Sequence, residues 1–479
     1  MTSAPTTLVK SATFAALLPV WPAELQARVQ AAARAADRTL VVLDDDPTGT
    51  QTVHNVPVVT RWNVETLRAE LRRAAPCFFV LTNSRSLPSA AACELSLDVA
   101  RNLRTASALA RRDFTLVSRS DSTLRGHFPA ETDALSDVCG PFDATILAPY
   151  FEAGGRYTLD NIHYVAEGDT LVPAGETPFA RDAAFGYRHS DLREWVEEKS
   201  AGRIRACDVQ SLSLDELRRG GPEAARAALL ELPQGCVCVA NLCAPRDAEV
   251  LAAATLAAEH AGKKYLYRTG ASFVSARLGL APRPLLNTGD LTNAGDGGGL
   301  VVVGSHVPRT TLQLERLLAS EPAPRRVELD VGSLLDPARR EDLLGEAAVR
   351  MAVALTAGED VLVFTSRSLI GGADASASLD IGRRVSDALV ALMRGLKATP
   401  RFVIAKGGIT SSDIATRGLG VVRAMVRGQI LPGVPVWQLG PESRFPGLNY
   451  VVFPGNVGDP DALTAAFTIL SRARTPSPT

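Results

Sequence analysis

Three adjacent carboxylates, Asp44, Asp45 and Asp46, open the first of three polar segments that could carry chemistry in this chain. Neighbouring carboxylates repel one another, so a protein keeps such a group where it meets a cation, a hydroxyl proton or a basic partner. The group is therefore a candidate general base or a candidate site beside a metal ion. An acidic turn that caps a helix is the alternative explanation.

Arginines and hydroxyls dominate the other two polar segments. Arg85 stands among small polar residues at positions 82–86, and residues 118–127 read S-R-S-D-S-T-L-R-G-H. The forked guanidinium of arginine suits a carboxylate or a phosphate, although an arginine on the surface would explain Arg85 equally well. Together the three segments indicate a small anionic substrate that is rich in hydroxyl groups. From the third segment we assign to this substrate Arg119, Asp121, Ser122, Thr123 and Arg125.

Glycine-rich turns mark the second half of the chain. They occupy residues 304–306, 406–413 and 454–459, and each comes at the end of an apolar run. Backbone N–H groups in such turns can point at phosphate groups. None of the three has the G-x-x-x-x-G-K-[ST] spacing of a P-loop or the G-x-G-x-x-G spacing of a dinucleotide fingerprint. One such turn is weak evidence, but three after predicted strands favour a nucleotide site.

Short β-branched runs alternate with helical periodicity along most of the chain, and these elements must position the polar segments. Strands are predicted at residues 39–43, 77–82, 114–117, 144–148, 300–303, 326–329, 361–365 and 401–405, with helices at residues 63–74, 88–111, 308–319, 337–357 and 376–394. This alternation predicts an α/β fold with two domains, each a mainly parallel sheet with helices on both faces. In such sheets ligands bind at the carboxyl ends of the strands, which is where the polar segments fall.

A polar, glycine-rich stretch without periodicity near residue 290 predicts the domain boundary. We expect a largely helical N-terminal extension at residues 1–37 and a substrate-binding domain at residues 38–286. A linker at residues 287–298 then leads to a nucleotide-binding domain at residues 299–479.

The composition excludes several classes of protein. Lys and Arg number 51 against 52 Asp and Glu, and the net charge of −1 argues against a nucleic-acid-binding face. No apolar stretch approaches the length of a membrane helix, and we expect no signal peptide. The seven cysteines form no C-x-x-C pair, which favours reduced thiols in a cytoplasmic protein over a zinc site. The expected partners are small molecules, and the sequence is also compatible with a homo-oligomer.

The motifs resemble those of the four-carbon acid sugar kinase family. The resemblance is carried by D-D-P-T-G at residues 45–49, D-S-T-L-R-G at residues 121–126, and the glycine turns at residues 407–408 and 454–456. Its most specific part is D-S-T-L-R-G followed by A-P-Y-F-E-A-G-G-R at residues 148–156. The family phosphorylates small sugar acids, such as threonate, erythronate and oxo-tetronates, with ATP. The resemblance covers residues 39–470 approximately and implies an N-terminal substrate domain and a C-terminal nucleotide domain.

The resemblance also implies roles for particular residues. Asp45, Arg85 and the stretch at residues 121–123 would hold the sugar acid. The residues that would hold ATP are Ser305, Lys406, Gly407, Gly408, Ile409, Thr410, Gly455 and Asn456. Mg²⁺ is expected with ATP, and its protein ligands are left open.

Phosphoryl transfer depends on positioning and charge neutralisation more than on covalent help from the protein. Our hypothesis is that Asp45 accepts the proton of the attacking hydroxyl in an in-line transfer. Asp46 is the alternative base, or else it organises Mg²⁺. Arg85 and Arg125 would bind the substrate carboxylate, and Lys406 with the glycine-turn amides would steady the ATP phosphates.

Two other classes of function fit parts of the sequence. A metal-assisted sugar-acid aldolase or isomerase would use the acidic segment, and it predicts activity without ATP. A non-catalytic sensor of a sugar acid or a nucleotide would make the acidic segment dispensable. The first alternative leaves the glycine turns unexplained and the second leaves the intact acidic segment unexplained, so the kinase hypothesis is preferred.

Overall fold

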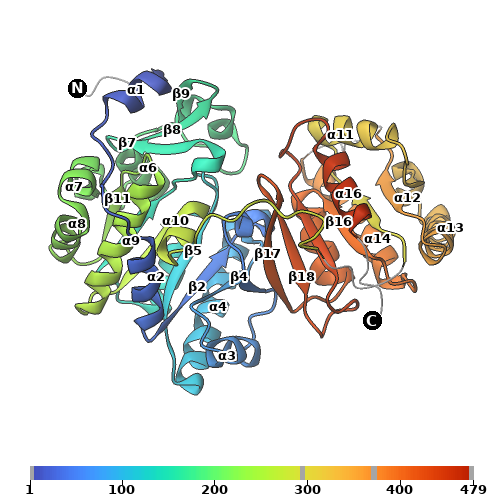
Figure 1. Cartoon of the computed structure of the whole chain (residues 1–479), viewed down its shortest axis with the longest axis horizontal. Helices are drawn as coiled ribbons and strands as arrows, with labels where there is room; N and C mark the ends of the chain where they lie inside the picture. Colours follow the sequence, from blue (N-terminus) through green and yellow to red (C-terminus); the bar gives the residue numbers. More distant parts are fainter. Residues whose placement is uncertain (1–4, 292–296, 368–374, 474–479) are drawn as a thin grey trace. The chain divides into compact units, whose positions relative to one another are not determined.

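The computed structural model describes residues 5–291, 297–367 and 375–473, and it divides the chain into two compact units. Unit 1 contains Met1–Val53 and Arg61–Pro282, and unit 2 contains His54–Thr60 and Arg283–Thr479 (Figure 1). The chain therefore leaves unit 1 and returns to it once before its final passage into unit 2.

A fully parallel sheet forms the centre of unit 1. Its strands are, in spatial order, β10 (Gln210–Leu212), β11 (Cys236–Ala240), β6 (Ala144–Ala148), β12 (Tyr265–Thr269), β5 (Asp113–Arg119), β2 (Arg38–Asp44) and β4 (Cys77–Leu81). The register pairs Asp44, the last residue of β2, with Arg119 of β5 and with Leu81 of β4. The carboxyl ends of these three strands are therefore level, and the polar segments that follow them start side by side.

The helices of unit 1 form two layers that cover both faces of this sheet (Figure 1). One layer contains α2 (Gln26–Ala35), α7 (Leu214–Arg219), α8 (Gly221–Leu230), α9 (Pro245–His260) and α10 (Ala271–Arg277), and the other contains α3 (Val64–Arg72), α4 (Ser89–Ala110) and α5 (Ala130–Cys139). Because both faces are covered, the strands read as continuous apolar runs, as in C-F-F-V-L of β4, where every residue is buried.

A separate antiparallel sheet, which we call the cap sheet, joins the segment after β6 to the N-terminus. Its strands are, in order, β1 (Leu8–Val9), β9 (Thr170–Pro173), β8 (Ile162–Glu167) and β7 (Arg156–Leu159). The helices α1 (Lys10–Ala16) and α6 (Leu192–Lys199) flank it in sequence. The N-terminal extension thus supplies a strand as well as α1 and α2. The helix α2 begins at Gln26, and its first helical hydrogen bond runs from Val29 N to Leu25 O.

The sheet of unit 2 is mixed, with five neighbouring parallel strands and an antiparallel edge. Its strands are, in spatial order, β3 (Val56–Val59), β17 (Arg423–Leu431), β18 (Val434–Leu439), β19 (Asn449–Phe453), β16 (Phe402–Lys406), β13 (Leu300–Val303), β15 (Val361–Thr365) and β14 (Arg325–Leu329). The pairs from β19 to β14 are parallel, whereas β3, β17 and β18 are antiparallel to their neighbours. The predicted fold class, two domains with mainly parallel sheets, is confirmed.

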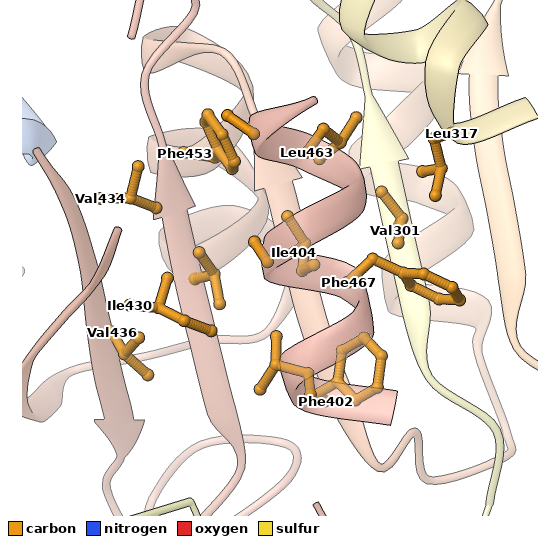
Figure 2. Packing of buried hydrophobic residues seen from close by; sticks show 14 of the residues in the cluster. Val301, Leu317, Phe402, Ile404, Ile430, Val434, Val436, Phe453, Leu463 and Phe467 are labelled. Atoms are coloured by element: carbon orange, nitrogen blue, oxygen red, sulfur yellow. The ribbon is translucent and has the colours of Figure 1, made fainter. Parts of the chain in front are cut away.

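Helices pack on both faces of this sheet as well. One layer contains α11 (Pro308–Leu318) and α16 (Ala462–Arg472), and the other contains α12 (Val331–Leu335), α13 (Pro337–Thr356), α14 (Ala375–Gly395) and α15 (Gly408–Asp413). Figure 2 shows Leu463 and Phe467 of α16 and Leu317 of α11 in one buried cluster with Val301 of β13 and Ile404 of β16. This core fixes the strands whose carboxyl ends carry the glycine turns.

The division of the chain differs from the sequence-based boundaries at two points. Residues 38–286 were expected to form one continuous domain, but His54–Thr60 belong to unit 2 because Val56 and Val59 of β3 pair with Val426 and Arg423 of β17. The second unit also begins before residue 287, since Leu286 is buried in its core and donates its N–H to Gln429 O at 2.7 Å. Residues 292–296 of the predicted linker lie outside the described residues. No described helix is long and apolar enough to span a membrane.

Candidate active site

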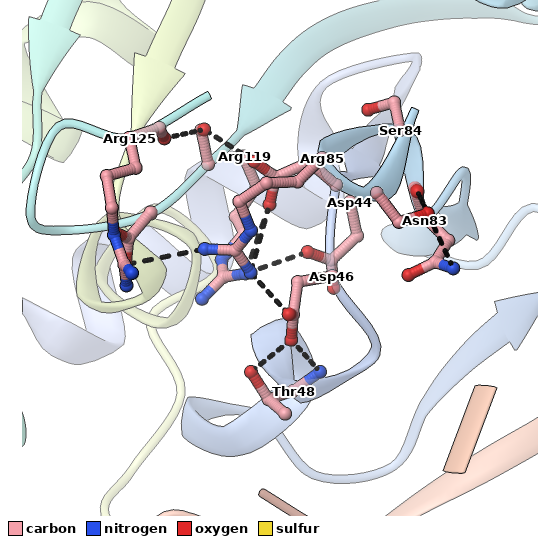
Figure 3. A network of polar contacts seen from close by, with 12 residues as sticks. Asp44, Asp46, Thr48, Asn83, Ser84, Arg85, Arg119 and Arg125 are labelled. Atoms are coloured by element: carbon pink, nitrogen blue, oxygen red, sulfur yellow. Dashed lines mark hydrogen bonds and ion pairs between the residues drawn. The ribbon is translucent and has the colours of Figure 1, made fainter. Parts of the chain in front are cut away.

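The acidic segment follows β2 directly, and backbone hydrogen bonds fasten it to the loop after β4. Thr82 N donates to Asp44 O at 2.9 Å, and Arg85 N donates to Asp45 O at 3.3 Å. Asn83 adopts a left-handed conformation with φ of 52°, which starts the short 3₁₀ turn η2 (Ser84–Ser86). This turn directs Arg85 towards the carboxylates (Figure 3).

Asp45 has the environment expected of a proton acceptor. Its side chain is 3% exposed, and Ser120 Oγ donates to its Oδ2 at 2.6 Å. Its Oδ1 makes no hydrogen bond to the described residues, although Arg119 Nη1 and Arg85 Nη2 lie 3.7 and 3.8 Å away. Burial raises the pKa of Asp45 above its ordinary value, and the two arginines oppose this shift only in part. Oδ1 is thus a buried, unpartnered oxygen with raised proton affinity.

The two neighbouring aspartates have other contacts, although Asp44 Oδ2 also lacks a hydrogen-bond partner among the described residues. Asp46 accepts a hydrogen bond from Thr48 N at 2.8 Å at the start of η1 (Pro47–Thr52), and it forms an ion pair with Arg85. Burial opposes its ionisation, but Arg85 and Thr48 outweigh burial and lower the pKa of Asp46. Burial raises the pKa of Asp44 to about 7 even though Arg119 Nη1 lies 3.0 Å from its Oδ1.

The D-S-T-L-R-G loop after β5 is held by its own side chains and by the cap sheet. Arg125 Nε donates to Asp121 Oδ2 at 2.6 Å, and Arg85 Nη1 lies 3.4 Å from Asp121 Oδ1. These arginines outweigh the effect of burial and keep the pKa of Asp121 well below its usual range. The loop backbone is anchored too, because His163 Nε2 hydrogen-bonds Ser122 O at 2.8 Å. The structure therefore brings together the predicted substrate residues of unit 1.

Two residues of this site were missed from the sequence. Arg268, at the end of β12, donates from Nη1 to Ser118 Oγ and to Glu131 Oε2, both at 2.7 Å. Glu131, at the start of α5, also accepts a hydrogen bond from Ser84 Oγ at 2.5 Å. Arg268 lines a small pocket together with Ser120, Asp121, Arg125 and Thr269. The signal available for Arg268 was its place at the carboxyl end of the buried run of β12.

In unit 2 the glycine turns after β13, β16 and β19 meet around Ser305. A Cβ atom at Gly407, whose φ is +118°, would lie 3.0 Å from Ser305 Cβ, and one at Gly455 would lie 3.1 Å from Ser305 Oγ. Thr310 Oγ1 donates to Gly455 O at 3.0 Å and lies 3.3 Å from Ser305 Oγ. The two glycines therefore let these turns pass close to the Ser305 side chain, where a Cβ atom would be crowded.

The remaining predicted ATP residues have different surroundings. Gly408 starts α15, Ile409 is 59% exposed, and Asn456 is exposed, whereas Thr410 is buried against Gly304. Arg367, which the sequence did not single out, donates from Nη2 to Ser305 O at 2.8 Å and to Thr311 Oγ1 at 2.7 Å. Its Nε and Nη1 are buried and have no hydrogen-bond partners within the part of the chain that the structure describes. A fixed guanidinium with two unused donors suits an anion.

Lys406 is fully buried at the end of β16, and its ammonium points at the neighbouring turn. Its Nζ donates to Pro454 O at 2.6 Å and lies 3.4 Å from Gly455 O and 3.9 Å from the centre of the Phe453 ring. The lysine therefore ties two glycine turns together. Across residues 5–291, 297–367 and 375–473, no three His, Cys, Asp or Glu side chains form a group that could hold a metal ion.

Both units match known families of domain. Residues 40–277 match a sugar-binding N-terminal domain, and residues 300–463 match a nucleotide-binding C-terminal domain. The chain is 30% identical over 380 residues to the D-threonate kinase of Cupriavidus necator, covering 76% of this chain and 81% of the relative. It is 27% identical over 450 residues to the 3-oxo-tetronate kinase of Methylobacterium radiotolerans, covering 89% and 98%.

The chain belongs to the four-carbon acid sugar kinase family. It is an enzyme, a phosphotransferase that uses an alcohol group as acceptor. The fold of this kinase is shared with crystal structures of a Haemophilus influenzae protein (TM-score 0.63, 19% identity, 90% of this chain and 100% of that one). A putative tRNA synthase from Salmonella typhimurium is equally similar (TM-score 0.64, 18% identity, 90% and 98%). At these identities the likeness concerns the fold alone.

The buried Lys406 should make the stability of this kinase depend on pH. Burial, with Arg309 adding to it, lowers the pKa of Lys406 to about 7, whereas an unfolded lysine titrates near roughly 10.4. At pH values between these two pKa values, Lys406 is protonated in the unfolded chain and largely neutral in the folded protein. The free energy of unfolding therefore rises with pH above about 7, with a slope approaching about 1.4 kcal/mol per pH unit.

We expect Lys406→Met to lose this rise in urea unfolding at pH 7, 8 and 9. Lys397→Met removes an exposed lysine from the same unit and should keep the pH dependence of the wild type. Parallel pH profiles for the wild type and Lys406→Met would contradict the prediction.

Proposed function

We propose that this kinase transfers the γ-phosphoryl group of ATP, with Mg²⁺, to a hydroxyl of a four-carbon sugar acid. The observation that carries the proposal is the environment of Asp45, a buried carboxylate with one unpartnered oxygen between two guanidinium groups. The names of the two relatives, a D-threonate kinase and a 3-oxo-tetronate kinase, support the choice of acid.

Asp45 acts as the general base in this mechanism. Its Oδ1 accepts the proton of the substrate hydroxyl as the hydroxyl oxygen bonds to the γ-phosphorus, and the bond from that phosphorus to the β,γ-bridging oxygen breaks to release ADP. Asp46 is less suited to this role, because its ion pair with Arg85 and its bond from Thr48 N stabilise its ionised form. Ser120, which donates to Oδ2, fixes the orientation of the base.

The other substrate residues position the acid. Asp121, Ser122 and Thr123 offer hydroxyl and carboxylate oxygens for the hydroxyl groups of the acid, and Asp121 is held by Arg85 and Arg125. Arg119 lies 3.0 Å from Asp44 and 3.7 Å from Asp45, so its positive charge offsets the negative charge of the acidic segment. These contacts serve positioning, which is the main contribution a protein makes to phosphoryl transfer.

The turns around Ser305 hold ATP. Backbone N–H groups of Gly408 and Gly455 would face the phosphates, and Arg367 would supply its two unused donors. Gly407 contributes differently, since its own N–H donates to Phe453 O at 2.8 Å and its lack of a side chain lets the turn pass close to Ser305. Thr410 and Asn456 add polar groups, while the exposed side chain of Ile409 offers an apolar surface to the nucleoside. Lys406 keeps the turn after β19 in place.

Mg²⁺ enters with the nucleotide. The described carboxylates offer no ready group of three ligands, so the phosphate oxygens and water would supply most of the coordination. When bound, Mg²⁺ would neutralise charge on the transferred group.

The direct test measures ADP release with ATP and Mg²⁺ against a panel of threonate and erythronate isomers and their oxo forms. We expect turnover with at least one acid and none when ATP is omitted. The proposal would be refuted if no acid of the panel were turned over and calorimetry detected no binding of ATP to the full chain. Conversion of an acid without ATP would favour the aldolase or isomerase hypothesis instead.

A further inference from the structure

A second guanidinium lies beside the D-S-T-L-R-G loop, and the proposed mechanism does not use it. Arg156 is the first residue of β7 and ends the A-P-Y-F-E-A-G-G-R segment. The guanidinium carbons of Arg125 and Arg156 lie 5.1 and 5.5 Å from the centre of the same ring, that of Phe179. Burial lowers the pKa of Arg156, the negative charge of Asp121 opposes this shift in part, and the like charge of Arg125 adds to it. Two positive side chains thus converge at the edge of the proposed substrate site.

The two arginines differ in how their donors are used. Arg125 is committed, because its Nε donates to Asp121 and its Nη1 lies 3.6 Å from Asp182 Oδ2. Arg156 has no carboxylate oxygen within 4.0 Å among the described residues, and its Nε is buried without a hydrogen-bond partner. A partly buried cation without a counter-ion is costly, and a bound anion would offset that cost.

The surrounding chain makes room for the Arg156 side chain and holds it still. A Cβ atom at Gly154 would lie 3.0 Å from Arg156 Nη1 and 2.4 Å from the Phe151 ring, so only glycine fits beside the guanidinium. The strand β7 pairs with β8, and His163 of β8 bonds to Ser122 O. Arg156 therefore has a fixed position relative to the loop that would bind the hydroxyl groups of the substrate.

We propose that Arg156 forms the carboxylate subsite of this kinase and sets its preference for sugar acids over neutral polyols. The inference rests on the proposed function and deepens it. Arg125 then acts as a positioning residue that shapes the loop through Asp121, in place of the direct contact with the substrate carboxylate that the sequence suggested. A guanidinium with unused donors can take a carboxylate through two parallel hydrogen bonds, which a neutral CH₂OH group cannot replace.

The test compares an acid with the polyol that has CH₂OH in place of its carboxylate, such as threonate with threitol or erythronate with erythritol. Arg156→Gln should raise KM for the acid and lower its kcat/KM by about 100-fold, as expected for a lost charged hydrogen bond. The kcat/KM for the polyol should change by less than about threefold, so most of the preference for the acid over the polyol should be lost. Arg156→Lys keeps the charge without the fork and should recover part of the preference.

Calorimetric titration of the acid and of the polyol, without nucleotide, measures the ratio of their dissociation constants. This second measure of the preference for the acid does not depend on turnover. The matched control is Arg181→Gln, which removes an exposed arginine near Phe179 and should behave as the wild type. Melting curves of all variants report on folding.

Three outcomes decide the matter. An unchanged ratio of acid to polyol in Arg156→Gln overturns the inference, as does an equal loss for both ligands, which would indicate a structural role. Wild-type protein that neither turns over nor binds any acid of the panel refutes the proposed function, and the inference with it. Failure of the inference would be seen in Arg156→Gln, whereas failure of the proposed function would be seen in the wild type. The two failures are therefore distinguishable.

Discussion

Asp45→Asn should lower kcat by about 10³-fold, within the range that general bases contribute. The amide keeps the shape of the side chain but cannot accept the hydroxyl proton, so binding of the acid should persist while turnover is lost. The raised pKa of Asp45 gives a second readout: kcat of the wild type should fall as the pH drops and the carboxylate becomes protonated. The measurements are kcat and KM for the best acid of the panel, with calorimetric binding of that acid.

Two other variants make this result specific. Asp37→Asn changes the charge equally at an aspartate that is 91% exposed just before β2, and it should leave kcat unchanged. Asp46→Asn should act mainly on KM, since Asp46 orients Arg85 and caps η1. Normal turnover of Asp45→Asn would exclude the base role, and a larger loss of kcat in Asp46→Asn would transfer that role to Asp46.

Gly126→Ala should destroy most of the activity, because the D-S-T-L-R-G loop needs a glycine where it passes the base. Gly126 has φ of +130°, and a Cβ atom there would lie 2.5 Å from Ser120 Oγ, 2.9 Å from Arg268 Nη2 and 3.2 Å from Asp45 Oδ2. The added methyl group must displace the hydroxyl that orients Asp45. We expect kcat/KM to fall by about 100-fold or more and the free energy of unfolding to fall by about 2 kcal/mol.

Gly202→Ala is the control that separates the effect of the steric clash at position 126 from the effect of backbone strain. Gly202 lies in the same unit with φ of +79°, and nothing stands within 4 Å of the Cβ position. That variant should lose only about 1 kcal/mol of stability and keep its kcat/KM. Urea unfolding and steady-state kinetics measure the two quantities, and equal losses of activity in both variants would show that the contact with Ser120 does not matter.

The regular part of the fold could be predicted because parallel strands buried on both faces are continuous apolar runs between glycine turns and helical periods. Residues 144–148, 300–303 and 361–365 are strands in the structure within the predicted bounds. The antiparallel elements could not be predicted in this way. The strands of the cap sheet and of the β17–β18 edge are short or carry alternating burial, as in β17, and their pairing depends on partners far away in the sequence.

The sequence by itself determined the chemistry at the strand ends. The carboxyl ends of neighbouring parallel strands meet at one edge of the sheet, so the segments after β2, β4 and β5 had to lie close together. The carboxylates, arginines and hydroxyls of these segments indicated an anionic, hydroxyl-rich substrate. The kinase family followed from the same residues.

Only the tertiary structure decided how these groups divide their roles. Asp44, Asp45 and Asp46 are chemically identical in sequence, and they differ because burial and the distances to Arg85 and Arg119 set their proton affinities. Long-range contacts likewise place β3 in unit 2. They direct the Lys406 ammonium to the carbonyl of Pro454, and they leave Arg156 Nε without a hydrogen-bond partner among the described residues. Burial and counter-charge depend on residues that are distant in the chain, so no local pattern encodes them.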